Sequence, residues 1–171
     1  MLTCEKCGYE IEGNIGVGFS FPRVYKETMK AARAGVLGKN IKEFLEEYPD
    51  GVLNTENTFL QCVDCGSLII GQNLSMYTRA SDASEKEHAR WSAAFPYEEE
   101  KNVVPWQLKE EGYRFYGYGN LCKKCGKPMK PIEEIQLQDF GLGEKKRRKQ
   151  TSFTCPKCGE FLQVMKTGLW D

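Results

Sequence analysis

Four short turns of one form, Cys-x-x-Cys-Gly, constrain this chain more than any other feature. They contain all eight cysteines: Cys4, Cys7, Cys62, Cys65, Cys122, Cys125, Cys155 and Cys158. Two residues between a pair of cysteines let both sulfurs point at one metal ion, and two such turns supply the four soft ligands of a tetrahedral site. The glycine after each second cysteine suits a turn that needs a positive φ. The sequence therefore predicts metal sites, each built from two turns.

Eight ligands in four turns predict two ions with four cysteines each. Pairing in sequence order closes the shortest loops, so we expect the first two turns to share one ion and the last two turns to share the other. The alternative pairings stay open, because the entropy of loop closure grows only slowly with loop length.

The turns CEKCGY and TCPKCG resemble those of zinc ribbons and, more loosely, of rubredoxin, in which two Cys-x-x-Cys-Gly turns also hold the metal. The resemblance covers the four turns and their flanking segments. It implies small antiparallel β modules with two structural Zn²⁺ ions, and iron in the same thiolate sites is the alternative. A way of holding metal is shared by proteins with many unrelated functions, so the resemblance alone names no activity.

Hydrophobic periodicity adds helices to these β modules and predicts an α+β fold. A helix is expected from Pro22 to Gly35, and a second one is expected to begin at Asn40, with Asn40 and Glu43 as a capping box. Short strands are expected on both sides of each turn. We expect three consecutive parts: a ribbon-like module with a helical insert at 1–80, a helical and charged connector at 81–112 and a C-terminal ribbon at 113–171.

Positive charge is concentrated near the C-terminus, although the formal net charge of the whole chain is zero. Residues 121–171 hold 11 Lys and Arg against 6 Asp and Glu. Five consecutive basic residues could contact the phosphates of a nucleic acid, and two nearby tyrosines could stack on its bases. These residues are Lys145, Lys146, Arg147, Arg148, Lys149, Tyr116 and Tyr118. The alternatives are a solvated loop and aromatic side chains that form part of a small core.

The sequence offers no catalytic constellation. His88 is the only histidine, which excludes zinc held by three histidines or by two histidines and a glutamate. Four thiolates around each ion would leave no open position for an activated water. No stretch resembles a signal peptide or a membrane span, and paired cysteines in such a chain indicate metal rather than disulfides, so a cytoplasmic location is expected.

Three functional interpretations follow. The chain is a zinc-stabilised binding module that contacts nucleic acid through its basic ribbon, a zinc-built adaptor that docks on another protein, or a rubredoxin-like iron protein that carries single electrons. Binding through zinc-stabilised modules is preferred, and the nature of the partner stays undecided.

Overall fold

The computed structural model describes residues 1–16, 21–79, 108, 112–132 and 149–164. The chain forms two compact units, and each unit is discontinuous in sequence. Unit 1 comprises residues 1–16, 57–73 and 120–171, and unit 2 comprises residues 17–56 and 74–119. This division differs from the three consecutive parts suggested by the sequence, because unit 2 consists of two segments that interrupt unit 1.

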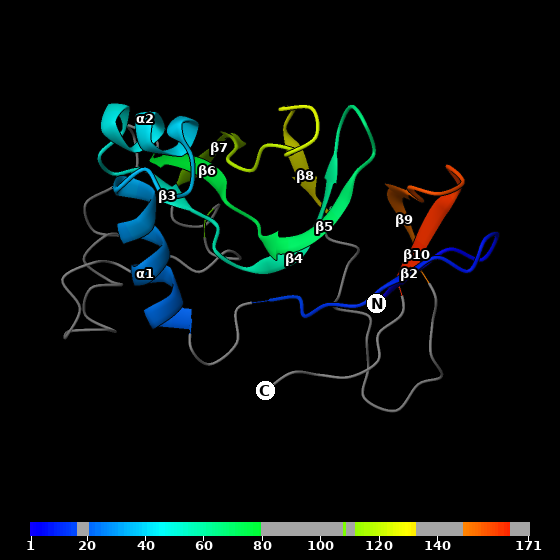
Figure 1. Ribbon diagram of the computed structural model, residues 1–171. Helices are drawn as coiled ribbons and strands as arrows, with labels where there is room; N and C mark the ends of the chain where they lie inside the picture. Colours follow the sequence, from blue (N-terminus) through cyan, green and yellow to red (C-terminus); the bar gives the residue numbers. More distant parts are fainter. Residues whose placement is uncertain (17–20, 80–107, 109–111, 133–148, 165–171) are drawn as a thin grey trace. The chain divides into compact units, whose positions relative to one another are not determined.

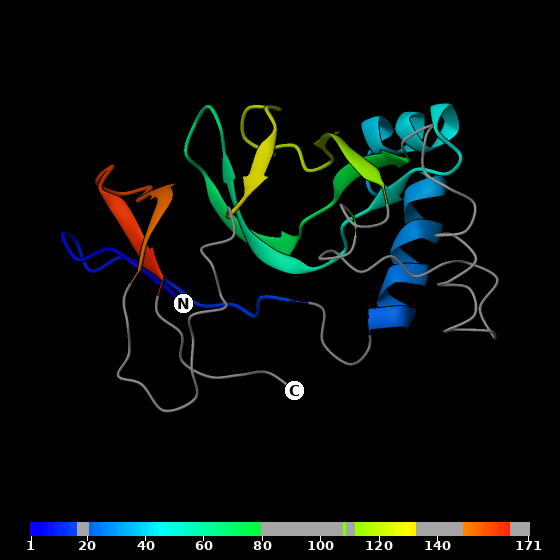
Figure 2. The same cartoon turned by 180° about the vertical axis from the view of Figure 1, so that it is seen from behind.

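In unit 1, a four-stranded sheet joins the two ends of the chain (Figure 1). Its strands are β1 (Leu2–Thr3), β2 (Glu10–Ile11), β9 (Lys149–Thr154) and β10 (Phe161–Val164), in the order β2-β1-β10-β9. All neighbours are antiparallel, and Leu2 of β1 lies opposite Val164 of β10. Figure 2 shows the same pairing from behind, with the blue N-terminal segment beside the red strand.

The second sheet of unit 1 has three strands in the order β5-β4-β8. A hairpin of β4 (Asn57–Cys62) and β5 (Leu68–Gln72) surrounds the second cysteine turn, and β8 (Met129–Pro131) pairs with the other edge of β4. The strands expected beside the first and second turns are therefore present. The segment from Leu68 to Arg79 forms two strands rather than one. Leu74, which has a positive φ of 51°, lies between β5 and the next strand.

Unit 2 packs two helices with a three-stranded antiparallel sheet. The helices are α1 (Phe21–Arg33) and α2 (Lys39–Glu47). The sheet has the order β3-β6-β7 and consists of β3 (Val52–Leu53), β6 (Ser75–Arg79) and β7 (Tyr113–Tyr118). Two helices and three antiparallel sheets in the described residues confirm the predicted α+β class.

The predicted apolar stripes of both helices are buried in the core of unit 2. Tyr25 and Met29 of α1 and Ile41 and Phe44 of α2 belong to one cluster of buried side chains, which β3, β6 and Tyr113 of β7 complete. The spacing i, i+3, i+4 places such residues on one helix face, where the sheet can cover them. Gly35 follows α1 with a φ of 78°, in agreement with its predicted role in ending that helix.

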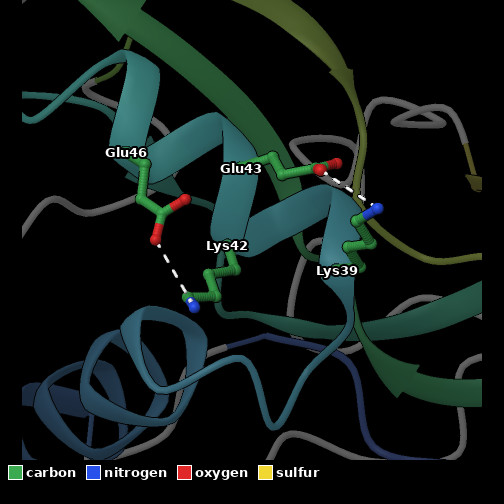
Figure 3. A network of polar contacts seen from close by, with 4 residues as sticks. All are labelled: Lys39, Lys42, Glu43 and Glu46. Carbon is green, nitrogen blue, oxygen red and sulfur yellow. Dashed lines mark ion pairs between the residues drawn. The ribbon is translucent and has the colours of Figure 1, made fainter.

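The capping box predicted for α2 is wrong. Helix α2 begins one residue earlier than expected, after Gly38, and no side chain caps its first turn. Asn40 lies inside the helix, where its Nδ2 donates a hydrogen bond to the carbonyl oxygen of Gly119 at 2.9 Å. Glu43 instead pairs with Lys39 at 3.4 Å (Figure 3). A contact distant in sequence has replaced the local cap.

Candidate metal centres

The four cysteine turns have the same backbone geometry. In each turn, the N–H of the first cysteine donates to the carbonyl five residues later, at 2.7–2.9 Å. The glycine N–H donates back to the carbonyl of the first cysteine, at 2.8–3.3 Å. The four glycines have φ values of 67–77° and are Gly8, Gly66, Gly126 and Gly159. Since side chains rarely adopt this region, the geometry explains why glycine follows each pair of cysteines.

The turns bring the eight sulfurs together in two groups of four. The outer site consists of Cys4, Cys7, Cys155 and Cys158, and the inner site consists of Cys62, Cys65, Cys122 and Cys125. Within each group all sulfurs lie within 4.8 Å of one another. Each site can therefore hold one metal ion, so that the chain can hold two.

Distances between the sulfurs fit four-coordinate metal rather than disulfides. Cys4 and Cys158 are 3.5 Å apart at Sγ, as are Cys7 and Cys155, and Cys62 and Cys125 are 3.4 Å apart. A metal–sulfur bond of about 2.3 Å places tetrahedral sulfurs about 3.8 Å apart, whereas a disulfide requires about 2.05 Å. All eight cysteines are free.

The predicted pairing of turns in sequence order is wrong. The first turn shares a site with the fourth, and the second shares a site with the third. The ligands of the inner site therefore lie, along the sequence, between the two turns of the outer site. The reason is strand pairing: β1 carries the first turn to β10 at the other end of the chain, and β4 pairs with β8 beside the third turn. Loop closure opposes this arrangement only weakly, because its entropy rises with the logarithm of loop length.

Burial divides each turn into a covered and an accessible sulfur. The first cysteine of every turn is buried, and these are Cys4, Cys62, Cys122 and Cys155. The second cysteine is half-buried at Cys65 and Cys158 and exposed at Cys7 and Cys125. Four thiolates complete a tetrahedral sphere, so each centre lacks the open position required by a catalytic metal.

Hydrogen-bond donors near some of the sulfurs favour the thiolate form, which is the form that binds metal, whereas burial and the neighbouring thiols raise the pKa of Cys125 and of Cys158 to about 12. The pKa of Cys65 is lowered to about 6 by the hydroxyl and the backbone N–H of Ser67, and Ser67 Oγ is 3.1 Å from the sulfur. Backbone N–H groups of Cys125 and Lys124 lower the pKa of Cys122. Only the second turn has a serine at this position, and the other three have Tyr9, Lys127 and Glu160 there.

The residues proposed for nucleic-acid contact are divided between the units. Lys145, Lys146, Arg147 and Arg148 lie outside the described residues, and Lys149 begins β9 in unit 1. Tyr116 and Tyr118 belong to β7 in unit 2. The two parts of the hypothesis thus do not fall in one structural unit, and their contact with nucleic acid stays a prediction.

Strand β7 carries an aromatic surface that is only partly covered. Phe115 is 51% exposed and packs against Tyr77 and Tyr118, with ring centroids 5.7 and 4.9 Å away. Tyr116 is 48% exposed and contacts Phe44 and Tyr48 of the helical layer. Tyr113 is buried. The core role therefore occurs for Tyr113, whereas base stacking by the exposed rings stays a prediction.

Sequence reasoning overlooked Gln61, the residue before the ligand Cys62. Its side chain is buried and makes three hydrogen bonds inside unit 1. One signal was available, because Gln61 is the only polar residue in the segment FLQC and lies on the same strand face as the apolar Phe59. His88 lies outside the described residues.

Neither helix among the described residues is long and apolar enough to cross a membrane. Comparison of the chain with models of protein families, with curated proteins and with solved structures finds no significant match.

Proposed function

We propose that this protein is a binding module in which two structural zinc ions hold unit 1 together, and that unit 2 docks on another protein. The observation that supports it is the closure of both sites by four cysteines from turns of one geometry. Zinc has no redox chemistry and prefers this tetrahedral thiolate set in structural sites. Sites without an open position are suited to stability rather than to catalysis.

The partner surface that we propose is the aromatic surface of β6 and β7, formed by Tyr77, Phe115 and Tyr118. Partly exposed aromatic rings are typical of the central residues of protein interfaces. Unit 2 holds 12 Lys and Arg against 14 Asp and Glu, so its net charge repels phosphates. Charge therefore favours a protein over a nucleic acid as the partner of this surface.

Elemental analysis of protein purified from its native host tests the metal proposal. We expect two zinc ions per chain and a colourless sample. Iron in four thiolates is red and redox-active, so a red sample that bleaches reversibly would favour the electron-carrier interpretation. Iron is the alternative to test, because turns of this form also hold the metal in rubredoxin.

Crosslinking in the native host tests the docking proposal. Phe115→Ser removes the most exposed ring of the aromatic surface, and we expect it to abolish a specific crosslinked species. Val36→Ser is the matched control, because Val36 is an exposed apolar residue of the same unit, at 76% exposure. A species that both variants lose, or that neither loses, would contradict docking through this surface.

Nucleic-acid binding through Lys145 to Lys149 is the second candidate, supported by the charge of residues 121–171. If about three to five of these residues neutralise phosphates, log K against log salt should have a slope of about −2 to −4 for a single strand. Replacement of the five residues by Ser should flatten that slope. No binding near 50 mM salt would exclude the candidate.

A further inference from the structure

The two metal sites are joined by the side chain of Gln61. Its Oε1 accepts a hydrogen bond from the N–H of Thr154 at 2.9 Å, and its Nε2 donates to the carbonyl oxygen of Thr154 at 2.6 Å. Nε2 also donates to the carbonyl oxygen of Gly66 at 3.1 Å. Gln61 directly precedes Cys62 of the inner site, and Thr154 directly precedes Cys155 of the outer site.

Strand β4 faces both sites through its alternating residues. Leu60 and Cys62 belong to the buried cluster around the inner site. Phe59 belongs instead to the cluster around the outer site, with Leu2 and Phe153. Gln61 is two residues from Phe59 and reaches Thr154, as the period of two in a strand requires. One strand thus provides packing for one site and ligands for the other.

We propose that the two sites bind their ions cooperatively and that Gln61 carries the coupling. This inference rests on the proposed function, since it requires a metal ion in each site. An ion in the inner site fixes Cys62, Cys65 and the carbonyl of Gly66. That order positions the Gln61 amide, which in turn holds Thr154 and the start of the fourth turn.

The amide pairs with Thr154 as a neighbouring strand would, through one N–H and one carbonyl of the same residue. Thr154 is half-buried, and both of its backbone groups lose these hydrogen bonds if the amide is removed, which is unfavourable wherever water does not replace the amide. If the coupling depended only on the shape of the Gln61 side chain, a replacement of similar shape such as Gln61→Met would preserve it. The replacement therefore distinguishes hydrogen-bond coupling from shape.

The test is a double-mutant cycle on the affinity of the outer site. Inner ligands are removed by Cys122→Ser with Cys125→Ser, and cobalt(II) or cadmium affinity is measured by competition with a chelator. We expect emptying the inner site to weaken the outer site about tenfold, within the usual range of coupling between sites. In the Gln61→Met background, the affinities of the outer site with and without the inner ligands should have a ratio near one.

Gln163→Met is the matched control, because it makes the same chemical change in β10 of unit 1. The buried Oε1 of Gln163 has no hydrogen-bond partner among the described residues, so the tenfold ratio should persist. A wild-type ratio near one overturns the proposal. A ratio that survives Gln61→Met, or that Gln163→Met abolishes as well, overturns the role of Gln61.

Cadmium-113 NMR of the chain with all eight cysteines covers the case in which the ligand variants do not fold. As chelator is added, the resonances of the two sites should decline together in the wild type, and half-loaded forms should appear as new resonances in Gln61→Met. Half-loaded wild type at statistical abundance would contradict coupling. Elemental analysis comes first: fewer than two ions per chain refutes the proposed function, whereas two uncoupled ions refute only this inference.

Discussion

Units 1 and 2 differ in what holds them together. Unit 2 contains no cysteine, and twelve of its described residues are buried in one cluster, among them Tyr25, Ile41 and Phe44. The buried residues in the described part of unit 1 form two smaller clusters, of seven and four residues, and each includes two cysteines. Apolar burial stabilises the first kind of unit without help, whereas small cores usually require a metal or disulfides. From this comparison we expect bound metal to stabilise unit 1 and not unit 2.

Metal removal should give the largest effect and should separate the units. Structural zinc contributes about 10 kcal/mol or more to the folding of small metal domains. A strong chelator should therefore abolish the hydrogen-exchange protection of β1, β4 and β10, while the amides of α1 and α2 remain protected. Loss of protection in both units at the same chelator concentration would contradict the comparison.

A core truncation should produce the reverse result. Phe44 is 2% exposed, and Phe44→Ala should destabilise unit 2 by about 3–5 kcal/mol through lost burial and a cavity. Urea unfolding with a probe in unit 2 measures the effect, and the metal content should stay at two ions per chain. Val36→Ala is the control and should change stability by less than about 0.5 kcal/mol. Release of metal by Phe44→Ala would show that the units depend on each other.

A glycine substitution in a cysteine turn should affect only unit 1, and less strongly. Gly126 has a φ of 74° with nothing near its missing Cβ, so Gly126→Ala should cost about 1–2 kcal/mol in backbone strain alone. Metal affinity of the inner site should fall about tenfold, as measured by chelator competition. Gly71→Ala in β5 is the control: no positive φ applies there, and its nearest neighbour would be Leu60 at 3.9 Å. Equal losses in both variants would refute the argument from φ.

The ion pairs on α2 should matter least. Figure 3 shows the pairs of Lys39 with Glu43 and of Lys42 with Glu46, both four residues apart. Because these side chains are largely exposed, Glu43→Ala should cost less than about 0.5 kcal/mol. A loss near 1 kcal/mol or more in thermal unfolding at low salt would mean that Glu43 does act in a cap, contrary to the structure.

Short stretches of sequence determined the local parts of this protein. The cysteine spacing and the following glycines define the four turns, because the steric limits on φ operate within a few residues. Helical periodicity likewise predicted the buried faces of α1 and α2. The eight candidate ligands and the number of metal sites can be inferred from these local patterns, and they were the most reliable inference from sequence.

Tertiary structure alone decided which turns share a site. It also decided which carbonyl accepts the hydrogen bond of Asn40 and which residue pairs with the amide of Gln61. Each of these contacts links residues far apart in the chain: 154 positions separate Cys4 from Cys158, and 93 separate Gln61 from Thr154. Closing a longer loop costs little additional entropy, so distance along the chain cannot select among partners. Selection comes from the pairing of β1 with β10 and of β4 with β8, in which many weak contacts form together.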